Sequence, residues 1–154
     1  MEVYIFRHAR ADFNSMDEDP PISEEGVAET KRVVELANQR FGFKPTVIVS
    51  SPVLRAKQTA ELAKKQLGLK SSIVDRCLFG DAEPSEVLKF LSKFKKEDRV
   101  ALVSHMPLIF ELLYTLVGGR GEVELLNGSI AAVSLRGKAT EGKGKLKWLI
   151  QPGV

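Results

Sequence analysis

Three short apolar runs, each followed by polar residues, constrain the fold of this chain more than any other feature of its sequence. They cover residues 3–6, 46–49 and 100–103. Apolar runs of this length, bounded by polar residues, are typical of strands buried in the sheet of an α/β protein. In a mainly parallel sheet, ligands bind in the crevice beyond the carboxyl ends of the strands. The residues that follow the runs are therefore candidates for a site.

Both histidines of the chain lie directly after such runs. Arg7 and His8 follow the first run, Ser104 and His105 follow another, and the remaining run leads within one helical turn to Arg55. Arginine supplies bidentate donors for phosphate oxygens and stays charged at any working pH. Neutral imidazole is a good nucleophile toward phosphorus, so a histidine can carry a phosphoryl group in a covalent intermediate. We assign that role to His8 and expect His105 to bind and stabilise the transferred group.

The rest of the pattern predicts helices that alternate with the strands. Residues 9–21 are polar and form an expected loop, after which Ser23 caps a helix that runs to about Arg40. A second helix is expected from Pro52 to a stop at Gly68. Then follow an expected short strand over 72–74, a loop over 77–84, a helix after a Ser85 cap, an apolar helix over 108–117, and a hairpin of strands 130–135 and 145–150. No linker interrupts this α/β order, so residues 1–154 are expected to form a single domain.

Composition limits the classes of function. With 154 residues and 44% hydrophobic content, the chain can bury a core without disulfides or metal. Lys and Arg number 23 against 20 Asp and Glu, which gives a net charge of +3 and suits an anionic ligand. Aromatic residues make up only 7%, so the interleaved aromatic and basic surface that binds single-stranded nucleic acid is not expected.

The single cysteine, Cys77, cannot form an internal disulfide and suits a reducing compartment. A cysteine phosphatase loop would require Arg at position 83, where Glu83 stands. The N-terminal apolar run is too short for a signal peptide, and no apolar stretch is long enough to span a membrane. We expect a soluble, cytoplasmic protein, a monomer or weak dimer that binds neither membranes nor nucleic acid. The scattered His and Cys residues show no metal-ligand spacing, so no metal is expected.

Four segments resemble the signatures of the histidine phosphatase superfamily, in the same order and over nearly the whole chain. They are Phe-Arg-His-Ala at 6–9, Pro-Ile-Ser-Glu-Glu-Gly at 21–26, the block at 49–60 that contains Ser-Ser-Pro-x-x-Arg-Ala-x-Gln-Thr, and Val-Ser-His-Met-Pro at 103–107. The block at 49–60 is long and specific. The small size, the Ser-His-x-Pro-Leu form around His105 and the late segment 128–131 resemble the SixA-type phosphohistidine phosphatases within that superfamily.

This resemblance implies a three-layer α/β/α sandwich with a mainly parallel central sheet, as in phosphoglycerate mutase. It also implies a phosphate pocket without metal or cofactor, formed by Arg7, His8, Arg55 and His105, with His8 as the phosphorylated residue. The chain departs from the family pattern at Ala9, where Gly is usual, and at Pro20, where an additional phosphate-contacting Arg is expected.

Two further residues follow from the resemblance. Phe13-Asn14 is similar to the Trp-Asn of the phosphoglycerate mutase branch, which makes Asn14 a candidate phosphate donor. Superfamily members with alcohol leaving groups often place their general acid in the mid-chain region, which makes Glu83 the first candidate, ahead of Asp81 and Asp12. A carboxylate at Glu83 could instead favour the start of a helix. A phosphoramidate bond is labile once its imidazole is protonated, so phosphohistidine hydrolysis could proceed without this acid.

These observations predict a metal-independent phosphatase that works through a phosphohistidine enzyme intermediate and acts on phosphohistidine of a protein. The short chain leaves little sequence for a lid, which favours a phosphorylated protein over a small phosphorylated molecule as partner. Two alternatives stay open. One is a small-molecule phosphomonoesterase or a phosphoglycerate mutase-like enzyme, and the other is a non-catalytic phosphate-binding module.

Overall fold

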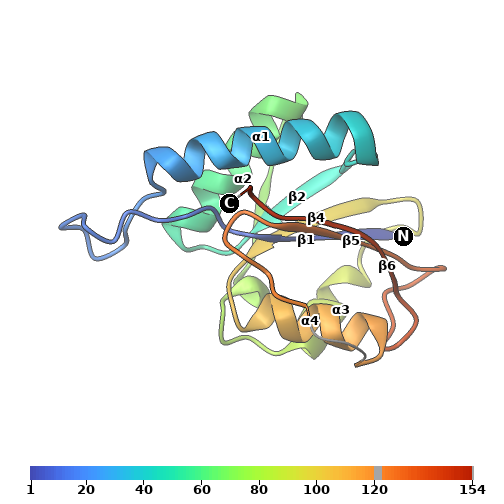
Figure 1. The fold of residues 1–154 in the computed structure, drawn as a ribbon. Helices are drawn as coiled ribbons and strands as arrows, with labels where there is room; N and C mark the ends of the chain where they lie inside the picture. The colour runs from blue at the N-terminus through green and yellow to red at the C-terminus, as the bar shows by residue number, and fades with distance from the viewer. Residues whose placement is uncertain (120–122, 154) are drawn as a thin grey trace.

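A six-stranded sheet forms the centre of the molecule in the computed structural model, which describes residues 1–119 and 123–153 (Figure 1). The strand order is β3-β2-β4-β1-β5-β6. The strands are β1 (Glu2–Arg7), β2 (Val47–Ser50), β3 (Ile73–Val74), β4 (Arg99–Ser104), β5 (Ile130–Ser134) and β6 (Lys145–Ile150). The first four in this order, β3, β2, β4 and β1, are parallel, whereas β5 runs antiparallel to both β1 and β6. The sheet is therefore mainly parallel, as predicted.

The register of the central strands brings the predicted site residues to one edge of the sheet. Arg7 at the end of β1 lies opposite Ser104 at the end of β4. The next residue of each strand is a histidine, His8 and His105. On the other side of β4, Ser50 at the end of β2 lies opposite Val103. Three carboxyl ends therefore meet at the same edge.

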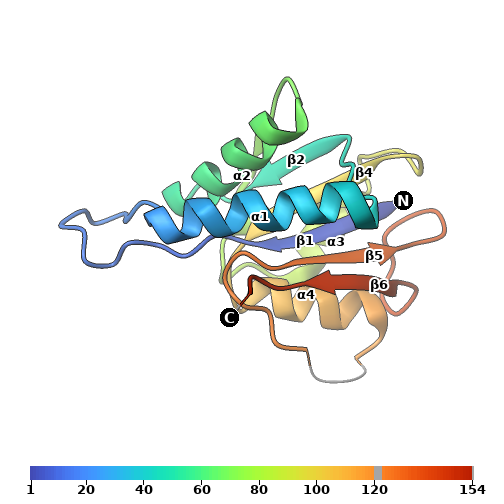
Figure 2. The ribbon, with the colours of Figure 1, turned by 45° about the horizontal axis from the view of Figure 1, so that its top comes forward.

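Helices cover both faces of the sheet, which confirms the three-layer α/β/α sandwich (Figures 1 and 2). On one face lie α1 (Glu24–Phe41) and α2 (Leu54–Leu67), and on the other lie α3 (Pro84–Leu91) and α4 (Leu108–Val117), with a short 3₁₀ turn over Arg76–Leu78. Alternate residues of β1 serve the two cores, because successive side chains of a strand point to opposite faces. Tyr4 and Phe6 pack with α1 and α2, whereas Val3 and Ile5 pack with α3 and α4.

Most predicted boundaries are confirmed. Ser23 caps α1 through its hydroxyl, which accepts a hydrogen bond from the Gly26 N–H. Gly68 ends α2 in the left-handed conformation, at φ 71°, where a residue without Cβ is unstrained. The apolar helix over 108–117 and the terminal hairpin are present as expected, the hairpin with its first strand one residue shorter. In the described ranges no helix is both long and apolar enough to cross a membrane.

Two predicted helix starts were wrong. The second helix begins at Leu54, two residues after Pro52, and its N-cap residue Val53 has no capping side chain. The third begins at Pro84 after Glu83, ahead of the Ser85 that was expected to cap it. Proline favours the first helical position, because its missing N–H would have no helical partner there. Pro84 takes that position, whereas α2 begins after Pro52, at Leu54, whose N–H donates to a side chain of a distant loop, described below.

Candidate active site

The two histidines leave the sheet side by side and are buried to the same extent. Each has 6% of its surface exposed, and their ring centroids are 5.0 Å apart with the ring planes at 53°. They end adjacent parallel strands, so the sheet itself sets their separation. The structure thus brings together the pair that the sequence predicted.

The hydrogen bonds of His8 leave one ring nitrogen unprotonated, as a base or nucleophile must be. Its Nδ1 lies 2.7 Å from the carbonyl oxygen of Ala9. A carbonyl only accepts, so Nδ1 carries the proton and Nε2 keeps its lone pair. The Nε of Arg55 lies 3.4 Å from that Nε2 and donates toward it. Burial, with help from the charges of His105 and the two neighbouring arginines, lowers the pKa of His8 to about 4. The imidazole is therefore neutral at neutral pH.

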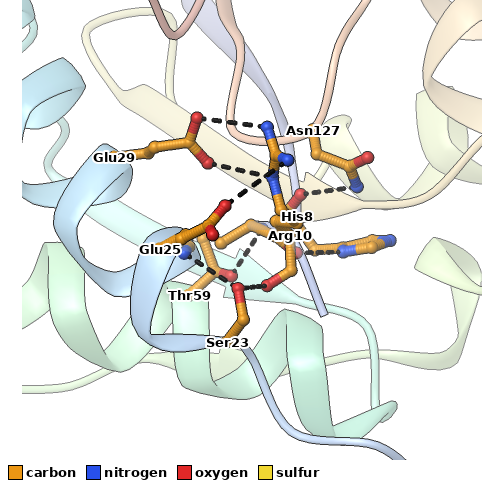
Figure 3. Close-up of polar contacts among 9 residues, drawn as sticks. His8, Arg10, Ser23, Glu25, Glu29, Thr59 and Asn127 are labelled. Carbon is orange, nitrogen blue, oxygen red and sulfur yellow. Dashed lines mark hydrogen bonds and ion pairs between the residues drawn. The ribbon is translucent and has the colours of Figure 1, made fainter. Parts of the chain in front are cut away.

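The backbone after His8 is held from two sides (Figure 3). The N–H of Ala9 donates to the hydroxyl oxygen of Thr59 on α2 at 2.9 Å. From the other side, the Asn127 amide and the Gly128 N–H donate to the carbonyl oxygen of His8, at 3.4 and 3.0 Å. These contacts restrain the position of the imidazole before any substrate binds.

Arg10 belongs to the frame of the site. Its guanidinium lies 3.6 Å from Glu25 and 3.3 Å from Glu29, both on α1, and its carbonyl oxygen accepts hydrogen bonds from Ser23 (Figure 3). With two carboxylates beside it, this arginine ties the segment after β1 to the first turns of α1. Its charge is offset within the protein by these two carboxylates.

The guanidinium of Arg7 is only partly hydrogen-bonded within the described residues. Its Nη1 donates to the carbonyl oxygen of Leu125 at 2.7 Å, while its buried Nε has no partner in the part of the chain that the structure describes. Burial lowers the pKa of this guanidinium, which nonetheless stays charged because arginine titrates far above neutral pH. A buried cationic donor without an acceptor is costly unless an anion binds there.

Arg55 lies in the first turn of α2, between His8 and a carboxylate of the 9–21 loop. Asp19 Oδ1 is 3.9 Å from Arg55 Nη1, and Asp19 Oδ2 accepts from the N–H of Leu54 at 3.1 Å. Asp19 therefore caps α2 from a position 35 residues earlier in the chain. A contact between residues so far apart in the chain cannot be predicted from a local sequence pattern.

His105 is bonded through the other ring nitrogen. Its Nε2 lies 2.7 Å from the hydroxyl oxygen of Ser51, and its buried Nδ1 has no partner among the described residues. Burial lowers its pKa to about 4 as well, with the positive charges of Arg55 and Arg7 acting in the same direction and Asp19 against it.

A close approach of the 79–84 loop supports His105. A Cβ added at Gly80 would lie 3.2 Å from the Cβ of His105 and 3.0 Å from the carbonyl oxygen of Met106. The missing side chain lets the loop pack on the histidine, and the Gly80 carbonyl then accepts from the Leu108 N–H at 3.2 Å. Neither Ser51 nor Gly80 was assigned a role from sequence, although Ser51 lies in the block at 49–60.

The remaining predicted residues lie outside this hydrogen-bonded group. Glu83 is the exposed N-cap residue of α3 and makes no side-chain cap bond, and Asp81 is exposed in the preceding turn. Asn14 is exposed and lines a hollow with Asp12, Arg10 and the start of α1. Their roles stay predictions. Within residues 1–119 and 123–153, no group of three or more His, Cys, Asp or Glu side chains could hold a metal ion.

The arrangement suits phosphoryl transfer. A neutral imidazole directs its unprotonated nitrogen at one guanidinium, with a second guanidinium from the preceding residue and a second imidazole beside it. Such fixed cationic donors stabilise the charge on the oxygens of a phosphoryl group in flight.

Comparison with known proteins agrees with this chemistry. The model of the histidine phosphatase superfamily (branch 1) matches residues 3–78. An uncharacterised protein of Picosynechococcus sp. is 32% identical over 130 residues, which cover 78% of this chain and 75% of that protein. Phosphohistidine phosphatase SixA of Escherichia coli is 29% identical over 160 residues, covering 99% of this chain and 94% of SixA.

The fold is shared with a solved relative. A structure of the protein histidine phosphatase SixA complexed with tungstate superposes with a TM-score of 0.84, at 28% identity, and the match covers 99% of this chain and 97% of that one. The similarity confirms the predicted phosphoglycerate mutase-like architecture.

Proposed function

This chain belongs to the histidine phosphatase superfamily, and its similarity to SixA within that superfamily supports a phosphatase. We propose that it hydrolyses phosphohistidine on a protein through a phosphorylated His8. One observation carries the proposal. The imidazole of His8 is buried and neutral, its Nδ1 is occupied by a backbone carbonyl, and its Nε2 lone pair faces the cation of Arg55.

In the first step, the lone pair on His8 Nε2 attacks phosphorus and the P–N bond of the substrate breaks. The departing imidazole keeps the bonding electron pair and takes a proton from solvent, which leaves neutral histidine on the substrate. In the second step, a water oxygen attacks phosphorus, the bond to His8 breaks, and inorganic phosphate leaves. His8 returns to its neutral form when the proton lost by water passes to solvent.

The donors around His8 have separate tasks in this scheme. Arg7 and Arg55 bind the equatorial oxygens, and the unpartnered Nε of Arg7 gains its acceptor. Ser51 donates its hydroxyl proton to Nε2 of His105, so that Nδ1 of His105 carries a proton and donates to a phosphoryl oxygen. The two guanidiniums supply the positive charge that a metal ion supplies in other phosphatases, and the proposed reaction is metal-independent.

Two observations support phosphohistidine as the substrate class. The relative SixA is a phosphohistidine phosphatase. No described carboxylate makes a hydrogen bond or ion pair with His8, and the ion pair of Asp19 is with Arg55. A substrate with a readily protonated imidazole as its leaving group needs the least help from a general acid. Glu83 stays the proposed acid for substrates with poorer leaving groups.

The surroundings of the site favour a phosphorylated side chain of a protein. The loop over residues 9–21 projects from the body of the molecule and does not fold back over the ends of β1 and β4 (Figures 1 and 2). Two large apolar side chains of that loop, Phe13 and Met16, are 74% and 101% exposed. Exposed apolar groups beside an active site are typical of a surface that contacts another protein.

The test is phosphate release, in excess chelator, from a phosphohistidine-bearing protein and from an aryl phosphate, with this protein and its His8→Ala variant. We expect turnover of the phosphohistidine substrate that is lost in the variant, whose fold is checked by circular dichroism. Turnover of the aryl phosphate alone would redirect the proposal to small phosphoesters. Turnover of neither substrate would favour a phosphate-binding module.

A further inference from the structure

A hollow of about 560 Å³ lies along α2, beside the phosphate pocket and separate from it. Neither histidine and neither pocket arginine lines it. We call it the α2 groove and define it by four apolar residues of its lining and two lysines: Ile22, Leu54, Leu62, Val74, Lys57 and Lys65.

The α2 groove begins where the phosphate pocket ends. Leu54 precedes Arg55, whose guanidinium contacts His8. Ser50, also in the lining, precedes Ser51, the partner of His105. The groove and the phosphate pocket therefore draw neighbouring residues from the end of β2 and the first turn of α2.

The walls of the groove are held by contacts between separate elements. The Ile22 N–H donates to Oε1 of Gln58 on α2 at 2.9 Å, which fixes the base of the 9–21 loop against the helix. On the opposite side, Val74 of β3 is paired with Ser50 of β2. β3 is the edge strand of the sheet, and Val74 is 50% exposed. The groove is thus preformed, with an apolar wall open to solvent.

The charges of the groove are of one predominant sign. Lys57 and Lys65 are exposed and make no ion pair within the described part of the chain. The single acidic side chain in the described lining, Glu61, is paired with Lys64 at 3.0 Å. Two ammonium groups against one carboxylate, beside apolar side chains, complement a surface that is both apolar and acidic.

We propose that the α2 groove is the docking site for the phosphorylated protein, and that it binds a segment whose apolar residues are flanked by acidic ones next to the phosphohistidine. This inference rests on the proposed function, because it assigns a place to the protein part of that substrate. A phosphoryl group alone occupies only the pocket. The protein that carries it must lie against the surface next to the pocket, and the groove is an apolar and positively charged part of that surface.

The experiment compares two histidine-phosphorylated peptides of equal length, prepared with phosphoramidate. One has Leu and Glu residues around the phosphohistidine, and the other has Ser and Lys. For the unmodified protein we expect kcat/KM to favour the acidic, apolar peptide by about tenfold, with the preference falling as ionic strength rises.

Charge reversal in the groove should abolish that preference. In Lys57→Glu/Lys65→Glu the ratio of the two kcat/KM values should fall to about one or below. The matched control, Lys89→Glu/Lys95→Glu, makes the same change of charge at exposed positions on and just beyond α3, across the sheet, and should keep the ratio. A second variant, Val74→Glu, changes an exposed residue and tests the apolar wall without burying a charge.

The outcomes separate this inference from the proposed function. If both peptides are hydrolysed at equal kcat/KM, or if the control lowers the ratio as much as the groove variant, the docking site is wrong while the function stands. If neither peptide is hydrolysed but an aryl phosphate is, the proposed function fails and the docking site with it. If the groove variants convert a dimer to a monomer, as measured by sedimentation, and the ratio stays, the occupant is a second copy of the chain and the proposal is overturned.

Discussion

The ends of β1 and β4 carry the same residue type under nearly the same conditions, yet they are bonded in opposite ways. His8 and His105 are equally buried, and the pKa of each lies near 4. His8 is held through Nδ1 by a backbone carbonyl, which leaves Nε2 against Arg55. His105 is held through Nε2 by the Ser51 hydroxyl, which leaves Nδ1 buried and unpaired in the described structure.

Burial and pKa do not distinguish the two histidines. They differ in which ring nitrogen is hydrogen-bonded to the protein and in the kind of group that bonds it. A carbonyl can only accept, so it forces one tautomer on His8 and directs a lone pair outward. A hydroxyl can donate as well as accept, so Ser51 is compatible with a proton on Nδ1 of His105. The bonding pattern therefore suits His8 for attack and His105 for donation.

The largest expected effect separates these two roles directly. His8→Asn should abolish the phosphoenzyme and lower kcat by about four orders of magnitude or more, because the nucleophile is gone. His105→Asn should still form the phosphoenzyme, with kcat lower by about two to three orders, as for the loss of one stabilising donor. Rapid acid- and base-quench labelling measures both. Label retained in His8→Asn and absent in His105→Asn would reverse the assignment.

The next effect concerns protonation. With only two histidines in the chain, ¹⁵N NMR resolves both imidazoles without ambiguity. Each should titrate near pH 4 in place of the ordinary 6.5, and His8 should appear as the Nδ1–H tautomer. A His8 that titrates near 6.5, or that carries its proton on Nε2, would contradict the hydrogen bonds described for His8.

The same shift predicts how stability depends on pH. Between pH 6.5 and 4 the unfolded chain binds a proton at each histidine and the folded chain does not. The free energy of unfolding should therefore fall as the pH decreases through this window, by about 1.4 kcal/mol per pH unit for each histidine. Urea unfolding at several pH values measures the slope, and His105→Asn should show about half of it.

A smaller effect, on stability, tests the hydrogen bond that holds the backbone after His8. Thr59 and Thr30 are both fully buried, but the Thr59 hydroxyl accepts from the Ala9 N–H, whereas the Thr30 hydroxyl has no partner among the described residues. Thr59→Val should lower the free energy of unfolding by about 1–3 kcal/mol, because it leaves a buried N–H unpaired. Thr30→Val is the matched control.

In that control the change removes an unpaired hydroxyl and keeps the shape of the side chain, so stability should stay the same or rise slightly. Urea denaturation with both variants gives the comparison. Equal losses at the two positions would mean that the contact with Ala9 contributes nothing to the turn after His8.

The smallest effect is expected at Asp19, whose carboxylate faces Arg55 and opposes the lowering of the His105 pKa. Its carboxylate lies 3.9 Å from Arg55 and competes with a phosphoryl group for that cation. Asp19→Asn keeps an oxygen to cap Leu54 and removes the charge, so inhibition by inorganic phosphate should become about two- to fivefold stronger. Asp17→Asn is the control, because Asp17 contacts Ser15 and not Arg55. Equal changes in both variants would indicate a general effect of charge.

Local patterns predicted the parts of this molecule that depend on neighbouring residues. Apolar runs marked β1, β2 and β4, Ser23 and Gly68 marked helix ends, and the positions after the runs marked His8 and His105. Each depends on side-chain alternation, capping or backbone freedom within a few residues. The placement of Pro52 at a helix start was wrong, and the side chain that caps the first N–H of α2, Asp19, comes from 35 residues away.

By itself the sequence determined the order of strands and helices along the chain, and therefore which residues follow the carboxyl ends of the strands. Only the tertiary structure decided how the two histidines differ, which carboxylate caps α2, and where the α2 groove opens. The reason is physical. A strand or a helix is encoded by residues close in the chain, whereas Ser51 on His105, Asp19 on Arg55 and Gln58 on Ile22 join segments that meet only when the layers pack.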